Sequence, residues 1–251
     1  MLLEGKNAII YGGGGAIGTA VAQKFAAEGA RVVLVGRSDS RLQTVAERIS
    51  AAGGRADVAV FDALDDAAVD RNADALAARA GSIDISFNLI SIGDVQGTPL
   101  ADMRTDDFMQ PIVNAVRSTF ITARAAARHM RRQRSGVILM FGGQGEPLRN
   151  YYIGGLQVAF SANEMLRRQL SAELGPHGIR VVTLRTGGIP ETLDPEFQGR
   201  EELAEQIASA SMLKRAATLE DVANVAAFVA SDQARTMTAA SVNISAGALV
   251  D

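Results

Sequence analysis

The sequence predicts a single α/β domain, a doubly wound parallel sheet of about seven strands in a three-layer αβα arrangement. Short apolar runs rich in β-branched residues alternate with longer, Ala-rich amphipathic stretches, which is typical of repeated strand–helix–strand units. No Pro/Ser-rich linker or internal repeat divides the 251 residues, of which 47% are hydrophobic. One domain spanning residues 1–251, with one sizeable core, is therefore expected.

The strands and helices are expected to follow this alternation along the chain. The β-rich runs predict strands at 7–11, 31–36, 56–61, 83–89, 136–142, 179–185 and 240–245. The amphipathic stretches predict helices at 16–28, 40–52, 66–80, 105–133, 151–174 and 219–230, with a shorter one near 198–210. Gly and Pro residues interrupt any helix over 186–199. Residues 186–212 are thus a candidate substrate lid at the carboxyl edge of the sheet, where such folds bind ligands.

Composition restricts the partners and the location. The net charge of −3 comes from interspersed charges, so neither nucleic acid nor an anionic membrane is favoured. The apolar runs fall well short of the ~20 residues of a membrane span. The first strand begins too early to leave room for a signal peptide, and a cytoplasmic location is expected. His129 and His177 are interpreted as structural, and no Cys, His or carboxylate spacing suggests a metal site.

A glycine run follows the first predicted strand, within "NAIIYGGGGAIGTAVAQKF" (7–25). Small residues at this point let the backbone and the N-terminal N–H groups of the next helix approach a pyrophosphate. A plain tight turn would also explain a glycine run. Its position between the first strand and the first helix of an alternating chain favours a Rossmann-type dinucleotide site.

Together with later segments, this turn resembles that of the short-chain dehydrogenase/reductase family, which reads Thr-Gly-x-x-x-Gly-x-Gly. Gly12 and Gly18 match that pattern, whereas Tyr11 replaces the Thr and Ala16 replaces the middle Gly. The resemblance continues through "FDAL" (61–64), similar to the turn that contacts adenine, and "IDISFNLIS" (83–91), similar to Asp-x-x-x-Asn-Asn-Ala-Gly.

The resemblance extends nearly to the end of the chain. "GPHGIRVVTLRTGGI" (175–189) is similar to the family's segment that contacts the nicotinamide, with Thr186 in place of its Pro, and residues 218–247 resemble the last helix and strand. The residues that this resemblance implies in cofactor binding are Gly12, Gly14, Gly15, Ile17, Arg37, Ser38, Asp62, Ala63, Asn88, Leu89, Ile90, Gly187 and Ile189.

The end of the second strand indicates NADP(H) as the cofactor. A carboxylate there would bind the NAD ribose, but Gly36 is followed by Arg37 and Ser38. A guanidinium can pair with the 2′-phosphate of NADP in a bidentate way. The alternative is a solvated loop arginine neutralised by Asp39.

The family's catalytic residues are replaced if the register is taken from "LSAELGPHGIRV" (170–181). That register puts Leu156 at the Tyr position and Phe160 at the Lys position. Counting back places Gly143 at the Ser position, and Ala115 takes the place of the helix-four Asn, with Asn114 one residue away. In the family's mechanism Tyr moves the proton while Lys lowers its pKa from about 10. The usual tetrad is therefore predicted to be absent.

Tyr152 is the candidate substitute, because it would lie one turn before Leu156 if the helix already includes it. The alternative is that Tyr151 and Tyr152 are loop or interface aromatics, and Gln144 or Gln157 could bind a carbonyl without moving a proton. Two functions stay open. One is an NADP(H)-dependent oxidoreductase acting on a small, apolar carbonyl or alkene substrate with non-standard or weak catalysis.

The other function is a catalytically silent dinucleotide-binding or scaffold protein, or a non-redox enzyme on the same fold. For either function, the resemblance implies a symmetric homo-oligomer, a tetramer or dimer, because the family's long fourth and fifth helices commonly pair between subunits.

Overall fold

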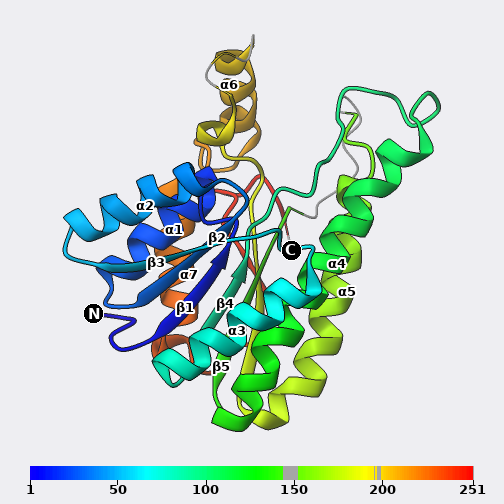
Figure 1. Ribbon diagram of the computed structural model, residues 1–251. Helices are drawn as coiled ribbons and strands as arrows, with labels where there is room; N and C mark the ends of the chain where they lie inside the picture. Colours follow the sequence, from blue (N-terminus) through cyan, green and yellow to red (C-terminus); the bar gives the residue numbers. More distant parts are fainter. Residues whose placement is uncertain (144–151, 195, 197–198, 251) are drawn as a thin grey trace.

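The computed structural model describes residues 1–143, 152–194, 196 and 199–250. Seven parallel strands form one sheet in the order β3-β2-β1-β4-β5-β6-β7. Their bounds are β1 Asn7–Tyr11, β2 Arg31–Gly36, β3 Arg55–Val60, β4 Ile85–Asn88, β5 Gly136–Gly142, β6 Ile179–Arg185 and β7 Ala240–Asn243. The predicted doubly wound αβα fold is confirmed (Figure 1).

Helices cover both faces of the sheet. Their bounds are α1 Ala16–Ala27, α2 Asp39–Ala51, α3 Asp66–Ala80, α4 Thr105–Gln133, α5 Leu156–Leu174, α6 Arg200–Ala210 and α7 Leu219–Ala230. One layer is made by α1, α2 and α7, and the other by α3, α4 and α5 (Figure 1). Each layer packs on the sheet through Ala, Val, Ile and Leu side chains, as expected for strands buried on both faces.

The strand order reverses between β1 and β4, because the chain winds outward through β2 and β3 and then returns to the other side of β1. Loops after these strands diverge at that point and leave a crevice at the carboxyl ends of the strands. Helix α6 projects beyond the sheet, and none of its residues is buried (Figure 1). No helix in the described ranges is both long and apolar enough to cross a membrane.

Element boundaries agree with the sequence prediction to within two residues, except at the start of α5. The helix predicted over 151–174 begins at Leu156. Gly154 has a φ of +55°, and a Cβ on Gly155 would meet the carbonyl oxygen of Phe108. The chain therefore passes close to α4 as a glycine turn before it can become helical, and Tyr152 lies outside the helix.

Candidate functional site

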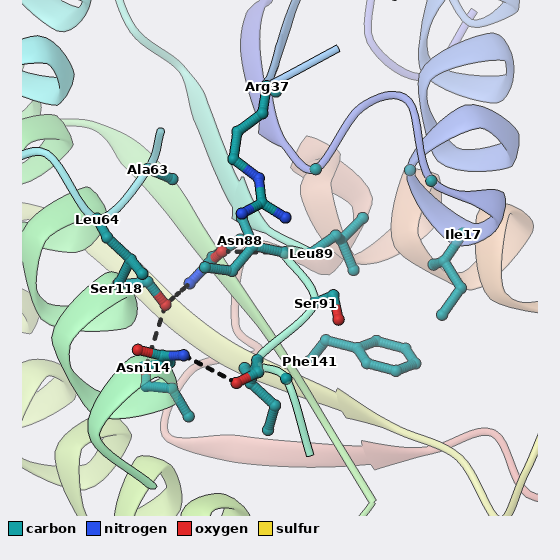
Figure 2. Close-up of a pocket in the computed structure, with 18 of the residues that line it drawn as sticks. Ile17, Arg37, Ala63, Leu64, Asn88, Leu89, Ser91, Asn114, Ser118 and Phe141 are labelled. Atoms are coloured by element: carbon teal, nitrogen blue, oxygen red, sulfur yellow. Dashed lines mark hydrogen bonds between the residues drawn. The ribbon is translucent and has the colours of Figure 1, made fainter. Parts of the chain in front are cut away.

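A cavity of about 960 Å³ lies at the carboxyl ends of the strands. Its walls come from the β1–α1 turn, the end of β2, the turn after β3, the end of β4, and the facing sides of α4 and α5 (Figure 2). This is the switch-point crevice where doubly wound sheets bind dinucleotides.

The β1–α1 turn is built by close contacts between backbones. Gly12 has a φ of +81°, and a Cβ there would collide with the carbonyl of Leu89. A Cβ on Gly18 would collide with the carbonyl oxygen of Gly12. The N–H groups of Gly12 and Gly13 both donate to Val35 O, at 2.8 and 3.0 Å, which fixes the turn on β2.

Helix α1 begins at Ala16, directly after this turn, and its N-cap is Gly15, which has no side chain to cap the first N–H groups. Gly14, Gly15, Ala16 and Ile17 line the cavity at this N-terminus. An uncapped helix N-terminus beside glycine backbone fits a dinucleotide phosphate group.

The opposite end of this wall carries two guanidinium groups. Arg37 extends into the cavity from the end of β2 (Figure 2). Arg41, in the first turn of α2, lines the cavity as well. Asp39, which could have neutralised Arg37, accepts a hydrogen bond from Gln43 Nε2 at 3.3 Å. The sequence prediction missed Arg41; its position four residues after Arg37 was the available signal.

The turns after β3 and β4 close this side of the cavity. Asp62 Oδ1 accepts from Leu64 N at 2.9 Å, which holds the 61–64 turn, and Ala63 lines the cavity beside it. Asn88 Nδ2 donates to Ser118 Oγ at 3.0 Å, and its Oδ1 accepts from Ile90 N at 3.3 Å (Figure 2). Asn88 thereby ties the end of β4 to α4.

The predicted cofactor residues fall into two groups. The cavity wall includes Gly12, Gly14, Gly15, Ile17, Arg37, Ser38, Asp62, Ala63, Asn88, Leu89 and Ile90. Gly187 and Ile189 are not among the described residues that line it. A Cβ on Gly187 would lie 2.6 Å from Ala248 Cβ, and Ile189 is buried in the core.

The wall made by α4 and α5 is apolar at the positions that align with the family's catalytic residues. Ala115, Leu156 and Phe160 all line the cavity. The Phe160 ring also covers Gly143, since its Cε2 lies 3.3 Å from where a Cβ on Gly143 would stand. Asn114 Nδ2 donates to Ile92 O at 3.0 Å. The other polar residues that α4 and α5 contribute to the lining are Gln110, Ser118, Thr119 and Asn163.

Two tyrosines can be judged as proton donors in this geometry. Tyr11 is fully buried between the sheet and α3, and burial followed by the charge of Asp70 raises the pKa of its hydroxyl far above the usual value. Tyr152 is 51% exposed and is not among the described residues that line the cavity. The condition for placing Tyr152 on the same face as Leu156, that the helix already includes it, is not met, because α5 begins at Leu156. Gln144 and Tyr151 lie outside the described residues.

Nothing in the described ranges gathers three or more His, Cys, Asp or Glu side chains in a geometry suited to a metal ion. The fold and cavity define a Rossmann-type dinucleotide-binding protein.

Comparison with known proteins narrows this class to a family. The model of a family described as enoyl-(acyl carrier protein) reductase matches residues 14–248. Secoisolariciresinol dehydrogenase of Forsythia intermedia is 32% identical over 93% of this chain and 85% of its own length. L-rhamnose 1-dehydrogenase (NAD(P)(+)) of Azotobacter vinelandii is 29% identical over 100% of this chain and 99% of its own.

Among solved structures, a short-chain type dehydrogenase/reductase from Mycobacterium ulcerans superposes with a TM-score of 0.91 at 27% identity, covering 99% of this chain and 91% of the other. The chain belongs to the short-chain dehydrogenase/reductase family, whose members are oxidoreductases that use a nicotinamide dinucleotide and act on small molecules.

Proposed function

We propose that the protein is an NADP(H)-dependent oxidoreductase that acts on a small carbonyl or alkene compound by a route that does not use the family's usual Asn-Ser-Tyr-Lys tetrad. The observation that carries the cofactor choice is the pair Arg37 and Arg41 on the cavity wall. Two guanidinium groups offer charge-assisted hydrogen bonds to a 2′-phosphate, and strand β2 ends without a carboxylate that would favour the plain ribose.

Other residues that line the cavity would hold the cofactor in an extended arrangement. The α1 N-terminus would receive the pyrophosphate, and the turn at Asp62 and Ala63 would contact the adenine. Asn88, Leu89 and Ile90 would line the path toward the nicotinamide. When bound, the cofactor supplies a hydride for the substrate carbon.

Proton delivery is the step that Leu156 and Phe160 leave weak. Leu156 and Phe160 can neither donate nor accept a proton, and they exclude water from the side of the cavity where they lie. Losing a positioned acid lowers a rate by about 10²- to 10⁴-fold. Slow reduction is therefore expected, with the proton taken from water in the open cavity. The same wall favours an apolar substrate surface next to α5.

The surroundings of the cavity support two further parts of the proposal. Thr192 belongs to the candidate lid 186–212 and lines the cavity. Exposed apolar side chains also lie along α4 (Met109, Val113 and Phe120) and α5 (Val158 and Met165). They support a homodimer or homotetramer paired through these two helices.

The test is a fluorescence titration with NADPH and NADH, run beside reduction of a panel of ketones, aldehydes and enones. We expect tighter binding of NADPH and slow but measurable reduction. Binding without any turnover would leave the catalytically silent alternative, and equal affinities would refute the choice of NADP(H).

A further inference from the structure

A second, much smaller chamber adjoins the cavity, and Phe141, Phe160 and Asn163 line both. Its volume is about 10 Å³. It is enclosed by α5, by the end of β5 and by β6, through Met140, Phe141, Gly142, Gly143, Phe160, Asn163, Glu164, Thr183 and Arg185. The volume matches a single water molecule.

Three buried oxygen atoms on the walls of this chamber lack hydrogen-bond partners among the described residues. They are Asn163 Oδ1, Glu164 Oε1 and Thr183 Oγ1. The three side chains are at least nine-tenths buried, with exposed fractions of 8%, 9% and 3%. Buried polar atoms are nearly always satisfied, so three such atoms around one small space indicate a bound molecule.

The chemistry of these atoms selects water as that molecule. Glu164 Oε2 accepts from Arg167 Nε and Nη2 at 3.1 and 3.0 Å, which leaves Oε1 as a free acceptor. Asn163 Oδ1 is a second acceptor, and the Thr183 hydroxyl can donate. A water molecule would donate to the two acceptors and accept from Thr183, making the three hydrogen bonds usual for buried water.

Asn163 connects this chamber with the larger cavity, because it lines both. It lies on α5 just under one turn after Phe160, on the same side of the helix. Its Oδ1 is buried, whereas its Nδ2, also without a partner among the described residues, keeps accessible surface. A water that holds Oδ1 inward fixes the amide with Nδ2 turned outward.

We propose that the chamber binds one structural water and that this water orients Asn163 so that its Nδ2 donates a hydrogen bond to the carbonyl oxygen of the substrate. The inference rests on the proposed reductase function. Asn163 would stabilise negative charge on that oxygen without giving up a proton, as an oxyanion-hole donor does. The proton itself would come from a water of the open cavity, and the resulting hydroxide would be neutralised by solvent.

The experiment compares variants of the full-length protein by crystallography, NADPH titration and carbonyl reduction. Asn163→Leu removes the donor, and kcat should fall about 100-fold with a smaller change in KM. Thr183→Val removes one partner of the water and should lower kcat about 2- to 10-fold. Thr183→Ser keeps the hydroxyl and should therefore keep kcat near the wild-type value. Ser171→Ala is the matched control: Ser171 is a buried polar residue of α5 that lines neither space.

Each outcome decides one part of the proposal. A high-resolution structure of the wild type should show one water bonded to Asn163, Glu164 and Thr183, lost in Thr183→Val; an empty chamber would overturn the water site. Unchanged kcat in Asn163→Leu, with NADPH still bound, would overturn the role of Asn163 alone. If the wild type binds NADPH but reduces nothing, the proposed function fails and the catalytic role of Asn163 fails with it, while the crystal structure still decides the water.

Discussion

The β1–α1 turn and the cavity-facing side of α5 both border one cavity, but the fold restricts their residue types to different degrees. In the first, backbone contacts dictate the residue type, since a Cβ on Gly12 or Gly18 would meet a carbonyl group. In the second, Leu156 and Phe160 line the cavity, and no backbone collision dictates their residue types. A helix can carry almost any side chain at such positions without changing the fold.

The fold requires the residues of the glycine turn, whereas only the reaction requires particular side chains on the cavity-facing side of α5. The cofactor end is tied to the architecture, because the glycine turn also joins β1 to β2 and to β4. The α5 wall can exchange a proton-transfer group for a leucine at little structural expense. Family membership therefore supports dinucleotide binding more strongly than it supports a particular chemistry.

The largest effect is expected from returning the family's side chains to the α4–α5 wall. Combining Ala115→Asn, Gly143→Ser, Leu156→Tyr and Phe160→Lys should raise carbonyl reduction by about 10²- to 10⁴-fold, because it restores a positioned acid. The measurement is kcat with NADPH on the same carbonyl panel. The threefold variant that keeps Phe160 is the control: its ring lies 3.3 Å from the position of a Cβ on residue 143, so the new serine would be crowded and activity should stay low.

Failure of the fourfold variant to gain activity, while NADPH still binds, would show that the register along α5 is misassigned. It would also weaken the contrast between the two regions, because the residue types on the cavity-facing side of α5 would then be as restricted as those of the glycine turn.

The second prediction tests whether backbone packing dominates at the glycine turn. Gly12→Ala should lower the free energy of unfolding by about 3–4 kcal/mol, since it adds a collision with Leu89 to the strain of a positive φ. Gly53→Ala is the matched control, with a φ of +82° but no atom within 4 Å of the new Cβ, and should cost about 1 kcal/mol. Urea denaturation measures both. Equal losses of unfolding free energy in the two variants would mean that the positive φ alone, without the contact with Leu89, explains why residue 12 is a glycine.

The third prediction concerns the adenosine end of the cavity. Arg37→Ala should weaken NADPH binding about 10- to 100-fold and change NADH binding little, because only NADPH offers a phosphate to the guanidinium. Arg41→Ala should act in the same direction with a smaller effect, because Arg41 lies farther along α2. Calorimetric titration measures both, with Arg48→Ala, an exposed arginine of α2 away from the cavity, as the control. A parallel loss of NADH affinity would show that the arginines stabilise the loop and do not recognise the phosphate.

The sequence predicted the fold well because periodicity and glycine punctuation report backbone structure directly. The strand ends and the glycine turn follow from such local signals, and so does the position of Arg37 after β2. The start of α5 could not be predicted from local signals, because it depends on the approach of Gly155 to Phe108, a contact between distant segments. Asn163 and Thr183 were missed for the same reason: one is on a helix and the other on a strand, and only packing brings their oxygens to one chamber.

The smallest effect is expected at Tyr152, the residue that the sequence favoured as proton donor. Tyr152→Phe should leave kcat within about twofold of the wild type, as surface substitutions away from special features usually do. Its side chain is half exposed, and the hydrogen bond that its carbonyl accepts from Gly97 N at 2.7 Å is a backbone contact that the change does not remove. Steady-state reduction by Tyr152→Phe should be compared with Asn163→Leu on the same substrates. A tenfold or larger loss of kcat in Tyr152→Phe alone would indicate that the proton donor lies in the segment before α5. The polar group that acts on the substrate would then be the Tyr152 phenol and not the Asn163 amide.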